Sequence, residues 1–402
     1  MATRIAYLVF LMMILCQLGC TEPFEIEDRG FESVLVVEST ITDEMKTQLV
    51  KLSRTSTLDT NVVLFENFAQ VAILTSDGER YNFSQDPNSG YYFSEEEFNA
   101  RPNVSYTLKI RTQDGKSYSS SESVLPPSVP LDEVYTETIN APSQNMDGVQ
   151  VLVNTLDPSG QAKYFRYEYE ETYKVIAPNP SPYTAEIVDF KAFPLSYNIV
   201  LRDREPEIIC YSTEYSSGIN QVATTDLNEN RVYRFPVKYL SKDDAKILAK
   251  YSILVKQYVQ SIDSYTFYKI LKDLGSVGNI LSQGQPGYVV GNISSDRDES
   301  EKVIGFFEVS SVSSKRIFFN YEDLGLEEPP YFVPCEVLSL DYFDNSTLDN
   351  DPDDRRALVN YIKYFDYQVL SATTTKIYKI VQPECSVCTY FSSKVKPDFW
   401  ED

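Results

Sequence analysis

The sequence contains no histidine and almost no tryptophan. Among its 402 residues there are 0 His, 1 Trp and 5 Met. Histidine shuttles protons near neutral pH and is the usual nitrogen ligand of zinc, so its absence excludes Ser-His-Asp and Cys-His catalysis and the common imidazole zinc sites. An enzyme that uses carboxylates alone is the weakest hypothesis, because no paired acid motif or nucleophile elbow is present. We expect no catalytic residues, no enzyme activity and no cofactor.

Basic residues are scarce as well. Lys and Arg number 36 against 59 Asp and Glu, which gives a formal net charge of −23. Such an excess of negative charge repels phosphate backbones and anionic lipid, so nucleic acid is not an expected partner. The acidity instead favours solubility of a surface-exposed protein. At this length the chain can form two or three domains with cores of their own.

Long apolar runs are absent except at the N-terminus. Arg4 supplies a positive charge, residues 5–15 are almost entirely apolar, and Gly19 stands directly before Cys20. The run is shorter than the roughly 20 residues of a membrane span, and the pattern is typical of a lipoprotein signal peptide. We predict that residues 1–19 are removed and that diacylation of Cys20 anchors the mature chain to a membrane. An ordinary secretory signal, which would leave Cys20 a plain thiol, is the alternative.

Residues 20–32 lack apolar periodicity and are predicted to form a flexible acidic tether. Their acidic residues are Glu22, Glu25, Glu27 and Asp28. Acidic residues straight after a lipidated cysteine resemble the export signal of Bacteroidota surface lipoproteins. This resemblance implies a lipid-anchored protein of the outer membrane that faces the cell surface.

Four cysteines remain in the predicted mature chain besides Cys20, and they are Cys210, Cys335, Cys385 and Cys388. An even number in an exported protein predicts two disulfides, with three connectivities open. The spacing of Cys385 and Cys388 also occurs in redox and zinc sites. No second CxxC, histidine or βαβ pattern accompanies it, so a structural role is favoured.

The rest of the chain predicts a mainly β fold. Residues 33–127 show period-two alternation with turn pairs at Asp77-Gly78 and Asp114-Gly115, which favours an immunoglobulin-like β-sandwich. Residues 128–402 are predicted to form a larger β-rich domain with short helical insertions and disulfides. Within it, residues 302–309 and 315–319 are expected to pair as two strands. Trp400 is expected to pack into this domain near the CxxC.

Two helices are expected in the second domain. One begins at the Ser261 cap and ends at Gly275, and the other covers about residues 354–365. The first is expected to bury an apolar side made of Tyr265, Tyr268, Ile270 and Leu271.

Two weaker candidate sites remain. Asp349, Asp351 and Asp353 have the alternate spacing of a calcium loop. The sixth and twelfth loop positions fail the EF-hand pattern, so a solvated acidic loop that caps the next helix is favoured and no metal is expected. Tyrosines could also stack on sugar rings or line a protein interface, although core packing is the favoured interpretation. These candidates are Tyr91, Tyr92, Tyr183 and Tyr197.

Several stretches, in this order, resemble one family. They are Leu35-Val-Val-Glu-Ser-Thr-Ile-Thr42, Gly90-Tyr91 with Tyr106-Thr-Leu-Lys-Ile110, Tyr251-Ser-Ile-Leu-Val-Lys-Gln-Tyr258, Gly291-Asn-Ile293, Gly305-Phe-Phe-Glu-Val309, and Cys385-Ser-Val-Cys388 with Lys396-Pro-Asp-Phe-Trp400. The family consists of Bacteroidota outer-membrane lipoproteins known only as a domain of unknown function, number four-two-four-nine. Its members are commonly encoded beside TonB-dependent transporters.

The resemblance therefore implies a non-catalytic outer-membrane lipoprotein that is an accessory partner of a TonB-dependent transporter in nutrient uptake. The alternative hypothesis is a free-standing surface adhesin or glycan- or protein-binding module.

Overall fold

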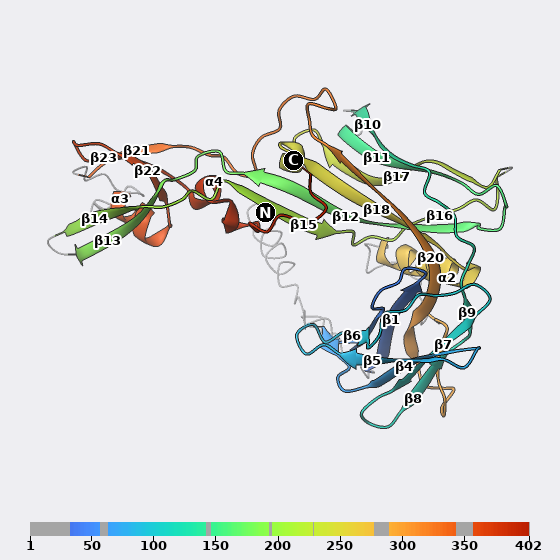
Figure 1. The fold of residues 1–402 in the computed structure, drawn as a ribbon. Coiled ribbons are helices and arrows are strands. Elements are labelled where there is room, and N and C mark those ends of the chain that lie inside the picture. Colours follow the sequence, from blue (N-terminus) through green and yellow to red (C-terminus); the bar gives the residue numbers. More distant parts are fainter. Residues whose placement is uncertain are drawn as a thin grey trace, which may run out of the picture.

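The computed structural model describes residues 33–56, 63–141, 146–192, 195–227, 229–276, 289–342 and 357–401. These residues form a mainly β protein with a few short helices. Figure 1 shows three lobes: an N-terminal lobe around β1 at the lower right, a central lobe above it, and a distal lobe at the left. Each lobe encloses its own cluster of buried apolar side chains.

One long strand, β20 (Val303–Phe319), belongs to both the N-terminal and the central lobe. Its first half pairs in parallel with β1 (Leu35–Thr42), and its second half pairs antiparallel with β18 (Tyr251–Val259). The two lobes therefore share one continuous hydrogen-bonded sheet, as Figure 1 shows. This continuity fixes where the first lobe meets the second.

The prediction of two separate strands at residues 302–309 and 315–319 was wrong. The serines between the two apolar stretches resemble a turn in the sequence, but they continue the strand. Ser310 Oγ donates to the carbonyl oxygen of Val259 (2.9 Å), and Ser311 Oγ donates to that of Pro127 (3.0 Å). These side-chain hydrogen bonds let polar residues lie buried at the centre of β20.

The N-terminal lobe forms because its strands alternate buried and partly exposed residues, as predicted. In β7 (Ser105–Arg111), for example, Tyr106, Leu108 and Ile110 are buried. The strand order is β20-β1-β2-β6-β5-β4-β7-β8-β19, so residues from far along the chain complete the lobe. The immunoglobulin-like class of this lobe stays a prediction. The other strands are β2 (Leu49–Arg54), β3 (Leu64–Phe65), β4 (Gln70–Thr75), β5 (Arg80–Gln85), β6 (Tyr92–Ser94), β8 (Ser117–Ser120), β9 (Ser123–Val124) and β19 (Ile293–Ser295).

The central lobe is a sandwich of two sheets. One has the order β15-β12-β18-β20, and the other has the order β10-β11-β17. Buried side chains of both sheets, such as Val151 and Val255, belong to one apolar cluster. The strands are β10 (Glu133–Ala141), β11 (Met146–Leu156), β12 (Tyr164–Ile176), β15 (Ile209–Tyr215), β16 (Asn220–Ala223) and β17 (Arg231–Ser241).

The distal lobe combines a hairpin, a small sheet and one helix around Leu358, Val369 and Ile380. The predicted helix at about 354–365 is present as α3 (Ala357–Tyr364). The hairpin strands are β13 (Tyr183–Lys191) and β14 (Ser196–Asp203), and the sheet strands are β21 (Leu338–Asp341), β22 (Gln368–Ala372) and β23 (Ile377–Val381).

The helix predicted after Ser261 is also present, as α2 (Ile262–Ser276). The backbone N–H of Ser264 donates to Ser261 Oγ (3.1 Å), which confirms the cap. The predicted buried side was partly wrong, because Ile270 is 43% exposed whereas Ser264 and Phe267 are buried. The buried face of α2 includes the hydroxyl of Ser264, which donates a hydrogen bond to Glu308 of β20. A pattern of apolar residues cannot predict such a polar contact. Among the described residues, no helix is long and apolar enough to span a bilayer.

Two disulfides tie the C-terminal segment to β15 of the central lobe and to the segment between β20 and β21. Cys210 of β15 is bonded to Cys388, and Cys335 is bonded to Cys385. The two cysteines of the CxxC thus have different partners and do not form a redox pair. Cys385 lies in α4 (Pro383–Ser386) and Cys388 begins η3 (Cys388–Tyr390).

Candidate functional site

The outer face of the β1–β20 pair lies at the junction of the N-terminal and central lobes. Side chains alternate along a strand, so Phe307 and Val309 fill the N-terminal core while Phe306 and Glu308 point to the opposite side. On that side Phe306 meets Phe267 of α2, with ring centroids 5.3 Å apart. Helix α2 therefore covers this part of the face.

A buried ion pair joins the two lobes at this place. Arg166 of β12 donates from Nη2 to Glu308 Oε2 (2.8 Å), and the side chains are 7% and 1% exposed. Glu308 also accepts hydrogen bonds from Ser264 (2.5 Å) and Gln260 (2.9 Å) at Oε1, and from Thr40 (3.1 Å) at Oε2. The Glu308 carboxylate of β20 therefore contacts residues of β1, β12 and α2 and the residue that follows β18. These elements meet at one buried charge.

These contacts keep Glu308 ionised. Burial by itself would raise the pKa of the carboxyl. The charge of Arg166 and the hydrogen bonds from Ser264 and Gln260 outweigh burial, so the pKa of Glu308 lies below its usual range. The pKa of Arg166 is raised: burial opposes the charge, but the nearby carboxylates of Glu308 and Glu168 more than compensate. Both groups therefore carry full charges at neutral pH.

Arg166 is held on several sides. Its guanidinium carbon lies 4.4 Å from the ring centroid of Tyr258 and 4.9 Å from that of Tyr268. Its Nη1 forms a second ion pair with Glu168. Its buried Nε has no hydrogen-bond partner among the described residues. The N–H at Nε is thus buried without an acceptor in the described part of the chain.

A cavity of about 670 Å³ opens beside this ion pair, and we call it the junction cavity. Its walls come from β1, β2, β12, β20, α2 and the loop between β15 and β16. The lining residues are Val36, Val37, Glu38, Ser39, Thr40, Leu49, Lys51, Arg166, Glu168, Ser216, Ser217, Gly218, Ile219, Phe267, Tyr268, Leu271, Ile304, Gly305 and Phe306. A cavity of this size between two lobes, with apolar and polar groups together, is a typical ligand site.

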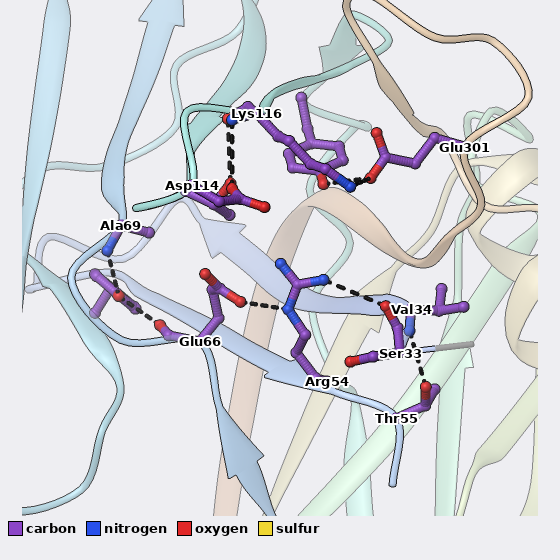
Figure 2. Close-up of polar contacts among 12 residues, drawn as sticks. Ser33, Val34, Arg54, Thr55, Glu66, Ala69, Asp114, Lys116 and Glu301 are labelled. Atoms are coloured by element: carbon purple, nitrogen blue, oxygen red, sulfur yellow. Dashed lines mark hydrogen bonds and ion pairs between the residues drawn. The ribbon is translucent and has the colours of Figure 1, made fainter. Parts of the chain in front are cut away.

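Other hollows lie away from the junction. One, of about 500 Å³, is at the end of the N-terminal lobe where β20 begins, and its lining includes Ser33 and Glu301. Figure 2 shows this end: Arg54 bonds Glu66 on one side and the carbonyl oxygen of Ser33 on the other, while Lys116 pairs with Glu301 at 2.7 Å. Its charged groups largely neutralise one another.

The distal lobe presents an aromatic surface, which we define as Tyr364, Phe365 and Tyr390. These side chains are 61%, 56% and 57% exposed. They border two adjoining hollows of about 460 and 380 Å³, which share Asp366 and Tyr367. Exposed rings beside polar groups are suited to contacts with a sugar or a protein.

One family model matches more than half of the chain. The model described as "Domain of unknown function (DUF4249)" matches residues 21–316. This chain belongs to the DUF4249 family. The match covers the described N-terminal lobe and reaches into the second half of β20. The terminal stretches at 385–388 and 396–400 lie beyond the matched residues.

No curated protein matches the chain. Among solved structures, the crystal structure of a DUF4785 family protein from Legionella pneumophila is similar at 11% identity and a TM-score of 0.18. The match covers 56% of this chain and 51% of the Legionella chain, so it spans about half the length of that protein.

The structure accounts for only part of the predicted sites. Cys20 and the calcium candidates Asp349, Asp351 and Asp353 lie outside the described residues. Within the described part of the chain, no group of three or more Cys, Asp or Glu side chains is placed to hold a metal ion.

Of the four candidate tyrosines, Tyr92 and Tyr197 are buried and Tyr91 and Tyr183 are partly buried. Trp400 packs against Tyr211, next to Cys210, with ring centroids 5.1 Å apart, which confirms its predicted docking.

Sequence reasoning missed the junction cavity. Arg166 and Glu308 are 142 residues apart, so no local pattern connects them. The one available signal is a charged residue at the centre of an otherwise apolar strand, Gly-Phe-Phe-Glu-Val, because an unpaired charge is not tolerated there.

Proposed function

We propose that this DUF4249 protein is a non-catalytic lipoprotein of the outer membrane that acts beside a TonB-dependent transporter in nutrient uptake. In this proposal diacylated Cys20 anchors a Bacteroidota protein at the cell surface, and its N-terminal lobe is immunoglobulin-like. Family membership supports the proposal through the genes that commonly accompany the family. The acidic tether and the signal pattern support the location.

The observation that carries the proposal is the junction cavity. It is formed by the lobe next to the anchor together with the following lobe, and a buried ion pair holds the two in place. A cavity of about 670 Å³ at this joint offers space in which a substrate can be retained before transport.

The position of the first described residue is consistent with this role. Ser33 lies at the end of the N-terminal lobe where β20 begins, and the central lobe lies beyond the other end of β1. A segment as long as residues 20–32 reaches at most about 45 Å when fully extended. A lipid at Cys20 therefore keeps the N-terminal lobe close to the membrane and to any transporter in it.

Gentle detergent extraction of outer membranes tests the partnership. The tagged protein is purified from its native host, and the co-purifying proteins are identified by mass spectrometry. A TonB-dependent barrel in stoichiometric amount is the expected result. Recovery of the protein alone, under conditions that keep known barrel complexes intact, would contradict it.

The aromatic surface of the distal lobe favours the second hypothesis, a free-standing adhesin or binding module. Its three exposed rings are available for stacking without any rearrangement. Binding of the full-length protein to a glycan array, lost on Tyr364→Ala or Tyr390→Ala, would shift the assignment to this function. Substitution of Tyr233, which is 66% exposed on the central lobe, is the matched control.

A further inference from the structure

We propose that the junction cavity binds a peptide that carries a basic side chain next to an apolar one. This inference rests on the binding role proposed above and names the class of ligand. It does not depend on which transporter, if any, is the partner. The charge of the cavity, the carboxylate of Glu38 and the apolar wall point to this class of ligand.

The charges that line or support the cavity do not balance. Arg166 is matched by Glu308 and paired again with Glu168. Lys51 stands opposite Glu38 in the strand register, but its Nζ lies over the ring of Tyr91, 5.0 Å from the centroid. Two positive groups thus lie near three carboxylates, of which Glu38 and Glu168 line the cavity and Glu308 is buried behind Arg166, so a ligand with one positive charge would restore neutrality.

Glu38 is the carboxylate that remains available. Its side chain is exposed on the outer face of β1, and within the described ranges no ion pair or side-chain hydrogen bond engages it. Glu168 also reaches solvent, with 42% of its side chain exposed. A lysine or arginine of a ligand can therefore meet Glu38 without breaking a contact that the protein already makes. The strongly acidic chain favours the approach of such a cation.

A further feature favours more than a simple cation. The partly exposed side chains of Leu271 and Ile304 make an apolar wall, and Phe267 and Phe306 are buried behind it. A metal ion would leave this wall unused. A neutral glycan would leave the carboxylate unused and would find little ring face, because Phe267 and Phe306 are only 5% and 6% exposed.

Calorimetry on the detergent-solubilised full-length protein tests the proposal. The probes are the tetrapeptides Ala-Leu-Lys-Leu and Ala-Leu-Glu-Leu, with maltotriose as a neutral sugar. The lysine peptide is expected to bind at least about tenfold more tightly than the glutamate peptide, since each unfavourable or lost charge contact changes affinity by about that factor. Equal affinity for both peptides, or binding of maltotriose alone, would overturn the proposal.

Two variants locate the binding. Glu38→Gln is expected to lower the affinity for the lysine peptide about tenfold. It should not lower the affinity for the glutamate peptide. Ser217→Trp places a large side chain in the wall of the cavity and should abolish binding, while Glu328→Gln, an exposed carboxylate elsewhere, should change nothing. An unchanged affinity in both cavity variants would show that the peptide binds at another place.

The outcome is separable from that of the transporter experiment. If a barrel co-purifies but no peptide binds, the ligand class is wrong and the proposed accessory role stands. If the lysine peptide binds through Glu38 but no barrel co-purifies, the ligand class stands and the accessory role is wrong.

Discussion

Arg166 of the central lobe and Glu308 of the shared strand β20 form an ion pair at 2.8 Å, with 7% and 1% of their side chains exposed. Taking two charges out of water is costly, and removing one of them leaves the other buried without a partner. Loss of either residue is therefore expected to destabilise the junction of the N-terminal and central lobes. Arg166 also lines the junction cavity.

Replacement of Arg166 by leucine should destabilise the protein by about 3–5 kcal/mol, because Glu308 then remains buried and unpaired. Denaturant unfolding followed by circular dichroism measures the change. Arg202→Leu is the control, since Arg202 and its partner Glu186 are 72% and 58% exposed. This surface pair should contribute less than about 1 kcal/mol. Equal effects of the two substitutions would contradict the assigned role of the buried pair.

The stability conferred by Glu308 should depend on pH. Its pKa is lower in the folded protein than in the unfolded chain, so its contribution is fully present above the ordinary glutamate pKa of about 4.3 and is lost as the pH falls through the folded value. The difference in unfolding free energy between wild type and Glu308→Gln should therefore narrow below about pH 4.3. Titration of the denaturation midpoint of both proteins measures it. A difference that stays constant down to the acid limit would contradict the lowered pKa.

Gly291 should not tolerate even a methyl group. A Cβ added there would lie 1.5 Å from the carbonyl oxygen of Gly305, so one of the two backbones must move. The neighbouring Asn292 side chain bonds both the N–H and the carbonyl of Phe307, at 2.8 and 2.9 Å, and this holds the segment in place. We expect Gly291→Ala to lower the unfolding free energy by about 2–3 kcal/mol.

Gly275→Ala is the matched control for that substitution. A Cβ at Gly275 meets nothing within 4 Å, and alanine favours the helix by about 0.5–1 kcal/mol. Thermal unfolding of both variants gives the comparison. A Gly291→Ala variant as stable as Gly275→Ala would show that the two segments do not approach closely.

The disulfide pairing can be tested one thiol at a time. In Cys210→Ala the partner Cys388 should become free, and in Cys335→Ala the partner Cys385 should become free. Alkylation of the unfolded, unreduced protein followed by digestion and mass spectrometry identifies the free thiol. Because the Cys210–Cys388 bond spans 178 residues, its loss should also cost about 3–5 kcal/mol. Labelling of Cys385 in the Cys210→Ala variant would contradict the pairing.

Membrane attachment should depend on the first cysteine. Cys20→Ser removes the thiol that diacylation requires, so the variant is expected in the soluble fraction after cell breakage. Ultracentrifugation and immunoblotting of wild type and variant measure the distribution. Cys335→Ser, which changes another cysteine far from the signal, should still sediment with membranes. A Cys20→Ser protein that sediments as the wild type does would exclude the lipoprotein interpretation.

The sequence alone was sufficient for much of the local structure. Period-two alternation and the pairs Asp77-Gly78 and Asp114-Gly115 predicted strands and turns of the N-terminal lobe, and both glycines adopt positive φ there. The cap at Ser261 predicted the start of α2. These features depend on residues close together in the chain, so their signal is present in any short window of sequence.

Tertiary structure decided everything that joins distant residues. Of the three possible cysteine pairings, the fold permits Cys210–Cys388 with Cys335–Cys385. These cysteines meet only when the C-terminal segment lies on β15. Tertiary structure also made β20 continuous through buried serines whose partners are the backbone oxygens of Val259 in β18 and of Pro127. It brought Arg166 to Glu308 and so created the junction cavity. Apolar periodicity records which face is buried, but the partner of a buried charge depends on how the lobes pack.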